Sequence, residues 1–118
     1  MNIGFIGLGN VGMSLATNLI QDDFQLHVYD LSFDAALPLI EKGASWAKSP
    51  QLLAEKSDLV ITCLPSPQAV CDVMEGKNGV FSGLRKKAIW IEMSTNDQNE
   101  ILRLGEIAND KGNGVLEA

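Results

Sequence analysis

The sequence predicts an α/β fold built on a doubly wound parallel sheet, and three observations support this prediction. Short apolar runs alternate along the chain with longer amphipathic stretches, which is the pattern of repeated strand–helix–strand units. A glycine-rich turn joins the first apolar run directly to the first amphipathic stretch. No internal repeat, low-complexity tract or long run of like charges interrupts the alternation. We therefore expect residues 1–118 to form one domain with six strands in the order 3-2-1-4-5-6.

The first half of the chain has the pattern of three strands with a helix after each of the first two. Ser32 is of the type that caps helix N-termini, and Gly43 is a typical stop signal. Pro38 lies between them and should kink or shorten that helix, because proline removes one hydrogen bond and clashes with the preceding turn. In order, the predicted elements are a strand at Ile3–Ile6, a helix at Val11–Ile20, a strand at Gln25–Tyr29, a helix from Ser32 towards Lys42, and a short strand at Ala44–Trp46.

The second half continues the alternation with three more strands. Ser49 followed by Pro50 places a capping residue before a proline at the first helical position, which predicts a helix start. The predicted elements are a short helix from Pro50 to near Lys56, a strand at Asp58–Leu64, a helix at Gln68–Met74, a turn-rich stretch at Gly76–Gly83, a strand at Ala88–Met93, a helix at Asn96–Lys111 and a strand at Val115–Glu117. The last strand has no covering element after it, so we expect the fold to be truncated at Ala118.

The composition argues against several classes of protein. A net charge of −6 and a pI near 4.6 argue against a surface for nucleic acid or for an anionic membrane, both of which require basic patches. No segment approaches the roughly 18 apolar residues of a membrane span, and the N-terminus lacks the basic region of a signal peptide. Two cysteines are too few for a disulfide framework. We expect a cytoplasmic protein with reduced thiols, with a Cys63–Cys71 disulfide as the less favoured alternative.

The turn Gly7-Leu8-Gly9-Asn10-Val11-Gly12 has the spacing G-x-G-x-x-G of a dinucleotide-binding Rossmann fold. Gly7 permits a tight turn out of the strand, Gly9 lets a pyrophosphate approach the backbone, and Gly12 lets the helix pack closely on the strand. The positive end of the following helix then faces the phosphates. Asp30 ends the next strand, near the position where an acidic residue binds the ribose hydroxyls.

The charge of Asp30 favours NAD over NADP, because a 2′-phosphate at this position would meet a carboxylate. The residues that follow, Leu31-Ser32-Phe33, supply no arginine to offset that repulsion. The alternative is that the glycines only turn the chain and that Asp30 is a solvated strand end. The glycine turn lies directly between a predicted strand and a predicted helix, and the acidic residue follows at the expected distance, so the dinucleotide site is favoured over this alternative.

The stretch Gly4-Phe-Ile-Gly-Leu-Gly-Asn-Val-Gly-Met-Ser-Leu-Ala-Thr-Asn-Leu19 resembles the opening of the β-hydroxyacid dehydrogenase family, which includes 3-hydroxyisobutyrate dehydrogenase and tartronate semialdehyde reductase. Val11 and Leu15 replace two methionines of the family pattern. Further similarities are Val28-Tyr29-Asp30-Leu31, Leu64-Pro65, Gly76-Lys-Asn-Gly79, and Ile91-Glu92-Met93-Ser94-Thr95. Together, the glycine motif and the resemblance imply that NAD is bound by Gly7, Leu8, Gly9, Asn10, Val11, Gly12, Asp30, Leu31, Leu64, Pro65 and Thr95.

The chain also departs from the family pattern. Gln98 stands where the family usually has a proline three residues after the threonine, so the loop beside the nicotinamide is expected to differ. The family continues after Leu116-Glu117-Ala118 with a substrate-binding segment, and then with a helical C-terminal domain that carries the catalytic lysine. No lysine of this chain occupies that motif position, so we expect the chain to be inactive alone.

For several other residues, a structural role is the first interpretation. Ser94 and Thr95 could cap the last helix, and on the residues alone this role and cofactor contact are equally favoured; the resemblance favours cofactor contact for Thr95. His27, the single histidine, is expected on an exposed face of a strand, and Cys63 in the packed core. With one histidine and two cysteines, neither a catalytic triad nor a zinc site is predicted. Arg85-Lys86-Lys87 is expected to be a solvated turn.

The resemblance implies an oxidoreductase that transfers hydride between nicotinamide and a β-hydroxyacid or semialdehyde. The alternative is a non-catalytic NAD(P)(H)-binding regulatory module, and a weaker one is a nucleotide-free structural domain. The partner expected for the full-length parent is a small hydroxyacid or semialdehyde, with no nucleic acid and no membrane. A homo-oligomer is left open, because members of the family assemble through the helical domain.

Overall fold

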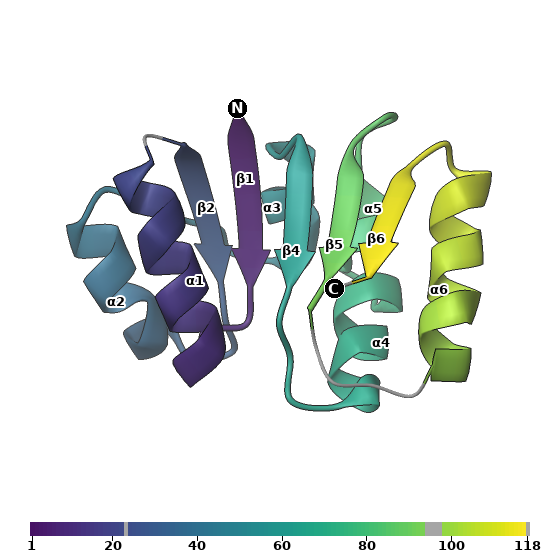
Figure 1. Cartoon of the computed structure of the whole chain (residues 1–118), viewed down its shortest axis with the longest axis horizontal. Helices are drawn as coiled ribbons and strands as arrows, with labels where there is room; N and C mark the ends of the chain where they lie inside the picture. The colour runs from purple at the N-terminus through teal and green to yellow at the C-terminus, as the bar shows by residue number, and fades with distance from the viewer. Residues whose placement is uncertain (23, 94–97, 118) are drawn as a thin grey trace.

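The computed structural model describes residues 1–22, 24–93 and 98–117, and its centre is a six-stranded sheet (Figure 1). The strand order is β3-β2-β1-β4-β5-β6 and every neighbouring pair is parallel, which confirms the predicted doubly wound sheet. The strands are β1 (Asn2–Ile6), β2 (Gln25–Tyr29), β3 (Ser45–Trp46), β4 (Leu59–Thr62), β5 (Ile89–Glu92) and β6 (Gly114–Glu117).

Helices cover both faces of the sheet, as the crossover connections between parallel strands require. They are α1 (Asn10–Gln21), α2 (Phe33–Glu41), α3 (Pro50–Glu55), α4 (Pro67–Glu75), α5 (Val80–Gly83) and α6 (Gln98–Asp110). The buried side chains form two clusters, one towards α1 and α2 and one towards the other four helices. Ile3 and Phe5 belong to the first cluster and Ile6 to the second, because successive side chains of a strand point to opposite faces.

Serine caps and prolines set the starts of two helices. Ser49 Oγ accepts a hydrogen bond from the N–H of Leu52 at 3.1 Å, which confirms the predicted start of α3. Ser66 Oγ accepts from the N–H of Ala69 at 3.1 Å in the same way, and Pro67 is the first residue of α4. The prediction began α4 one residue too late, because Pro67 occupies the first helical position, where its missing N–H costs no helical hydrogen bond.

Two local features differ from the predictions, while a kink at Pro38 stays a prediction. Helix α2 continues through Pro38 and ends at Glu41, so the proline does not shorten it. Pro38 and Asp34 are both exposed, which lets water hydrate the carbonyl that the missing N–H leaves unbonded. The stretch predicted as turns at Gly76–Gly83 contains the short helix α5. That helix packs closely on α3, where a Cβ at Gly83 would lie 2.2 Å from the carbonyl oxygen of Gln51.

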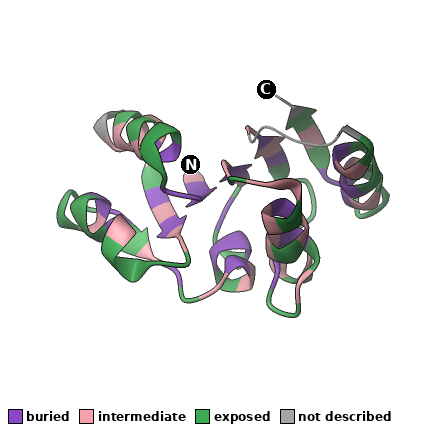
Figure 2. Cartoon of the chain, turned by 90° about the horizontal axis from the view of Figure 1, so that it is seen from below, coloured by how far each residue is buried: buried purple, intermediate pink, exposed green. Residues whose placement is uncertain are grey.

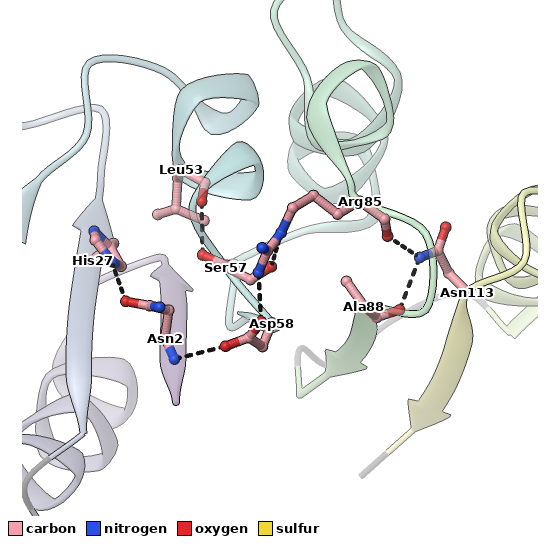
Figure 3. A network of polar contacts seen from close by, with 8 residues as sticks. All are labelled: Asn2, His27, Leu53, Ser57, Asp58, Arg85, Ala88 and Asn113. Carbon is pink, nitrogen blue, oxygen red and sulfur yellow. Dashed lines mark hydrogen bonds and ion pairs between the residues drawn. The ribbon is translucent and has the colours of Figure 1, made fainter.

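A chain of polar contacts ties together the amino ends of the strands (Figure 3). Asp58 accepts hydrogen bonds from the N–H of Asn2 at 2.9 Å and from the guanidinium of Arg85 at 2.5 Å. Buried Asn113 donates to the carbonyl oxygens of Arg85 and Ala88, which holds the turn before β5. Because Arg85 takes part in these contacts, the basic turn Arg85-Lys86-Lys87 has a structural role. It lies at the amino ends of the strands, on the side of the sheet away from their carboxyl ends (Figure 3).

His27 belongs to the same group of contacts. Its Nε2 lies 3.1 Å from Oδ1 of Asn2, and the ring is partly buried rather than exposed. Burial lowers the pKa of His27, and the positive charge of Lys56 lowers it further. The histidine therefore joins β2 to β1 through Asn2, at a distance from the carboxyl ends of the strands where ligands bind in such sheets.

Replacing Gly105 with alanine is expected to stabilise the protein by about 0.5–1 kcal/mol, because glycine within a helix costs more conformational entropy than alanine. Gly105 lies within α6, and a Cβ there would have only an ordinary contact, 3.9 Å from Cγ1 of Val115. The measurement is the urea midpoint of the native full-length protein. Gly112→Ala is the matched control: a Cβ there also has space, but φ is +87°, so this variant should lose about 1 kcal/mol. An unchanged or lower midpoint for Gly105→Ala would contradict the prediction.

Candidate functional site

A cleft of about 680 Å³ opens at the carboxyl ends of β1, β2 and β4. Figure 2 is viewed from the side on which these strands end. From β1 the sheet continues through β2 and β3 on one side of the cleft and through β4, β5 and β6 on the other. The cleft therefore lies where the direction of strand addition reverses, between β1 and β4. Open α/β sheets bind their ligands at such a point, because the connections on the two sides diverge there. The walls are the turns that follow the three strands, together with one face of α4.

Two glycines shape the turn between β1 and α1. Gly7 has φ of +100°, and a Cβ there would lie 2.1 Å from the carbonyl oxygen of Cys63. A Cβ at Gly12 would lie 2.1 Å from the carbonyl oxygen of Gly7. Both contacts are with backbone atoms, which cannot move aside as a flexible side chain can. Gly7 is therefore required for the close approach of the turn after β1 to the chain after β4, and Gly12 for the close approach of α1 to β1.

Gly9 has a different environment from the other two glycines of the turn. A Cβ there would meet nothing within 4 Å among the described residues, and φ is −68°, so folding does not require a glycine. Gly9 is the N-cap residue of α1, and no described side chain caps this helix, whereas Ser49 and Ser66 cap α3 and α4. The first N–H groups of α1 therefore open onto the cleft beside an uncovered stretch of backbone, an arrangement that suits a phosphate.

Asp30 connects the turns after β1 and β2. Its Oδ2 accepts a hydrogen bond from the N–H of Leu8 at 2.8 Å, and its Oδ1 accepts one from the N–H of Ser32 at 2.9 Å. These bonds fix the carboxylate at the rim of the cleft, partly buried. Ser32 is the N-cap residue of α2, as predicted, but its side chain makes no capping bond, and its backbone N–H instead bonds to Asp30. Among the described residues, no lysine, arginine or histidine lines the cleft.

Apolar side chains line the rest of the cleft, and two of them are unusually exposed. Leu31 is 94% exposed and Val11 is 66% exposed, so both present apolar surface to solvent beside Asp30 and the start of α1. Leu64 and Pro65 lie on the wall after β4. Exposed apolar surface that surrounds a concave, partly polar site is typical of a ligand pocket.

All of the predicted cofactor contacts that the structure describes line this one cleft. Thr95, together with its neighbour Ser94, lies outside the described residues. Three further residues of the cleft lining were not predicted, and all lie on α4: Ala69, Asp72 and Val73. Their spacing of three and four residues places them on one face of a helix, but this pattern alone does not say what that face meets.

Cys63 also differs from its prediction. It was expected in the packed core, but it is only partly buried and lines the cleft directly before Leu64. Burial raises the pKa of the Cys63 thiol, and the negative charge of Glu92 raises it further. Cys71, on α4, is also a free thiol, so the less favoured disulfide is not formed. Cys63 thus contributes a neutral, uncharged surface to the cleft at physiological pH.

Residues 2–118 match the family model described as the NAD binding domain of 6-phosphogluconate dehydrogenase. The chain belongs to this family. It is therefore an NAD-binding domain of the 3-hydroxyisobutyrate dehydrogenase-like group, which confirms the resemblance and the cofactor predicted from the sequence. No helix in the described part of the chain is long and apolar enough to cross a membrane.

Several known proteins that resemble the NAD-binding domain are dehydrogenases and reductases. It is 43% identical over 93 residues to the 3-sulfolactaldehyde reductase of Escherichia coli, covering 79% of this chain and 31% of that protein. It is 36% identical over 116 residues to the mitochondrial 3-hydroxyisobutyrate dehydrogenase of Rattus norvegicus, covering 98% of this chain and 35% of that protein. The chain thus spans about a third of the length of these relatives.

A solved structure also resembles the NAD-binding domain and supports its assignment to this family. The 3-hydroxyisobutyrate dehydrogenase of Mycobacterium tuberculosis, determined with L-serine, superimposes with a TM-score of 0.89 at 26% identity. The similarity covers 99% of this chain and 39% of that one. The open space at Gly9 and the uncapped start of α1 fit a dinucleotide, because its pyrophosphate needs both a close backbone approach and unpaired N–H groups.

Proposed function

We propose that residues 1–118 are the cofactor-binding domain of an NAD-dependent oxidoreductase acting on a β-hydroxyacid or the corresponding semialdehyde. The observation that carries the proposal is the cleft that combines the glycine turn, the uncapped start of α1 and the carboxylate of Asp30. The similarity to hydroxyacid dehydrogenases and aldehyde reductases supports the substrate class. NAD would supply the hydride acceptor or donor, and the domain would bind and orient it.

Different residues of the cleft would bind different parts of NAD. The backbone of Leu8, Asn10 and Val11 would hold the pyrophosphate at the start of α1, beside the open surface of Gly9. Asp30 would accept hydrogen bonds from the ribose hydroxyls, with its position set by the N–H groups that already hold it. A carboxylate with two fixed donors loses little conformational freedom when it binds a ligand, which favours tight recognition.

The remaining predicted contacts extend along the cleft on either side of the pyrophosphate. Leu31 would cover one face of the adenine ring, and Leu64 and Pro65 would lie along the half of the cofactor that leads to nicotinamide. Thr95 stays a predicted contact of the nicotinamide side, on the resemblance alone. Asp30 would also exclude a 2′-phosphate by charge repulsion, so the domain would prefer NAD to NADP.

A non-catalytic NAD-binding regulatory module is the second candidate, and one observation favours it. No lysine is among the described residues that line the cleft, so the cleft offers no amine to move the alcohol proton. In the leading proposal, that lysine belongs to a helical domain beyond residue 118. Oligomeric state and a cytoplasmic location stay predictions in both proposals.

The test is the intact mass of the native protein together with an assay of NAD-dependent turnover. The leading proposal expects a native chain far heavier than 12.7 kDa and reduction of NAD in the presence of a small β-hydroxyacid. A native chain that ends at Ala118, binds NAD and shows no turnover would overturn it in favour of the binding module. A native protein that binds no dinucleotide would overturn both.

A further inference from the structure

The cleft has a second acidic side chain that the glycine motif and Asp30 leave without a role. Asp72 lies on α4, in the wall across from Asp30 and Leu31, and its side chain is exposed. Its Oδ1 accepts a hydrogen bond from Nε2 of Gln68 at 2.8 Å, one turn earlier on the same helix. The bond from Gln68 occupies Oδ1 and orients the carboxylate. Asp30 and Asp72 are the charged residues among those described that line this cleft.

The position of the adenine follows from the groups that would bind the rest of the cofactor, so this step rests on the proposed function. The pyrophosphate lies at the start of α1 and the adenosine ribose at Asp30, which places the adenine beyond Asp30, beside Leu31. The opposite wall there is the face of α4 that carries Ala69 and Val73. Apolar surface on both sides suits the two faces of a flat aromatic ring.

We propose that Asp72 is a specificity-determining residue that accepts a hydrogen bond from the exocyclic amino group of the adenine. The edge of adenine presents an amino donor at C6, whereas hypoxanthine and guanine present a carbonyl acceptor at the same position. An ionised carboxylate can only accept, so at C6 it pairs with the amino group of adenine and is opposed by the carbonyl oxygen of the other two bases, whose N1–H donor lies at the neighbouring ring position. Asp72 would thus select an adenine dinucleotide, while Asp30 selects the unphosphorylated ribose.

Two dinucleotides that differ only at this base position give the test. The native full-length protein is titrated with NAD and with nicotinamide hypoxanthine dinucleotide, and tryptophan fluorescence or calorimetry gives the dissociation constants. The wild-type protein should bind NAD about fivefold more tightly, since a good hydrogen-bond pair discriminates by at least about that factor. Asp72→Asn should reduce the preference to less than about twofold, because an amide can donate to the carbonyl as well as accept from the amine.

Asp110→Asn is the matched control, because it removes one exposed carboxylate from the far end of α6 without touching the cleft. It should keep the wild-type preference. Gln68→Ala should lower the preference without abolishing it, because Gln68 only orients the carboxylate. Equal binding of the two dinucleotides by the wild-type protein, or an unchanged preference in Asp72→Asn, would overturn the role of Asp72 alone. Failure to bind either dinucleotide would overturn the proposed function as well.

Discussion

A methyl group added at Gly12 is expected to destabilise the fold and to remove cofactor binding together. The Cβ of Gly12→Ala would lie 2.1 Å from the carbonyl oxygen of Gly7, so α1 must move away from β1. Overpacking of this kind costs about 3 kcal/mol when backbone has to shift. The shift would also displace the first N–H groups of α1 from the cleft. Urea unfolding and NAD titration of the native full-length protein would measure the two losses.

Gly9→Ala is the matched variant, because it should separate the two effects. The added methyl group has open space and an allowed φ of −68°, so the free energy of unfolding should change by less than about 0.5 kcal/mol. The same methyl group would project where the pyrophosphate approaches the backbone, and NAD affinity should fall by about 100-fold, as expected when a phosphate loses its backbone contacts. If Gly9→Ala binds NAD like the wild type, the pyrophosphate does not lie on this turn.

The strand order was predictable from the sequence because each strand and helix carries its own local pattern. The apolar runs and the helix starts at Ser49 and Ser32 depend on neighbouring residues, and right-handed crossovers then leave few arrangements of the sheet. The exceptions depend on contacts between elements. The short helix α5 packs closely on α3 at Gly83, and such a contact has no trace in the local sequence of the stretch Gly76–Gly83.

The candidate site likewise has one part that the sequence predicts and another part that depends on packing. The glycine turn and Asp30 were found because a fixed spacing along the chain carries the geometry of this site. The α4 wall with Asp72, and the position of Cys63 in the cleft lining, depend on how α4 and the end of β4 meet the turn after β1. That meeting is set by packing between residues far apart in the sequence, including the contact of Gly7 with the carbonyl of Cys63. No local pattern contains it.

Asp30→Ala is expected to weaken NAD binding by about 30-fold, because hydrogen bonds to a charged group contribute about 2 kcal/mol. NADP should lose much less, since its 2′-phosphate no longer meets a carboxylate, so the ratio of the two dissociation constants should narrow by at least about tenfold. Both constants are measured on the native full-length protein. Unchanged affinity for both dinucleotides would show that Asp30 does not contact the ribose.

Two further variants separate the charge of Asp30 from its role in holding the turns. Asp30→Asn keeps an acceptor for one of the N–H groups of Leu8 and Ser32, loses the bond to the other and removes the negative charge, so NADP should bind more tightly than in the wild type while NAD weakens modestly. Asp34→Ala removes an exposed carboxylate from the first turn of α2, outside the residues that line the cleft, and should leave the ratio unchanged. If the ratio of the NAD and NADP dissociation constants also narrowed in Asp34→Ala, the preference for NAD would come from the general negative charge around α2. A ratio that responds only at position 30 assigns it to one carboxylate, fixed in place by the two turns that it joins.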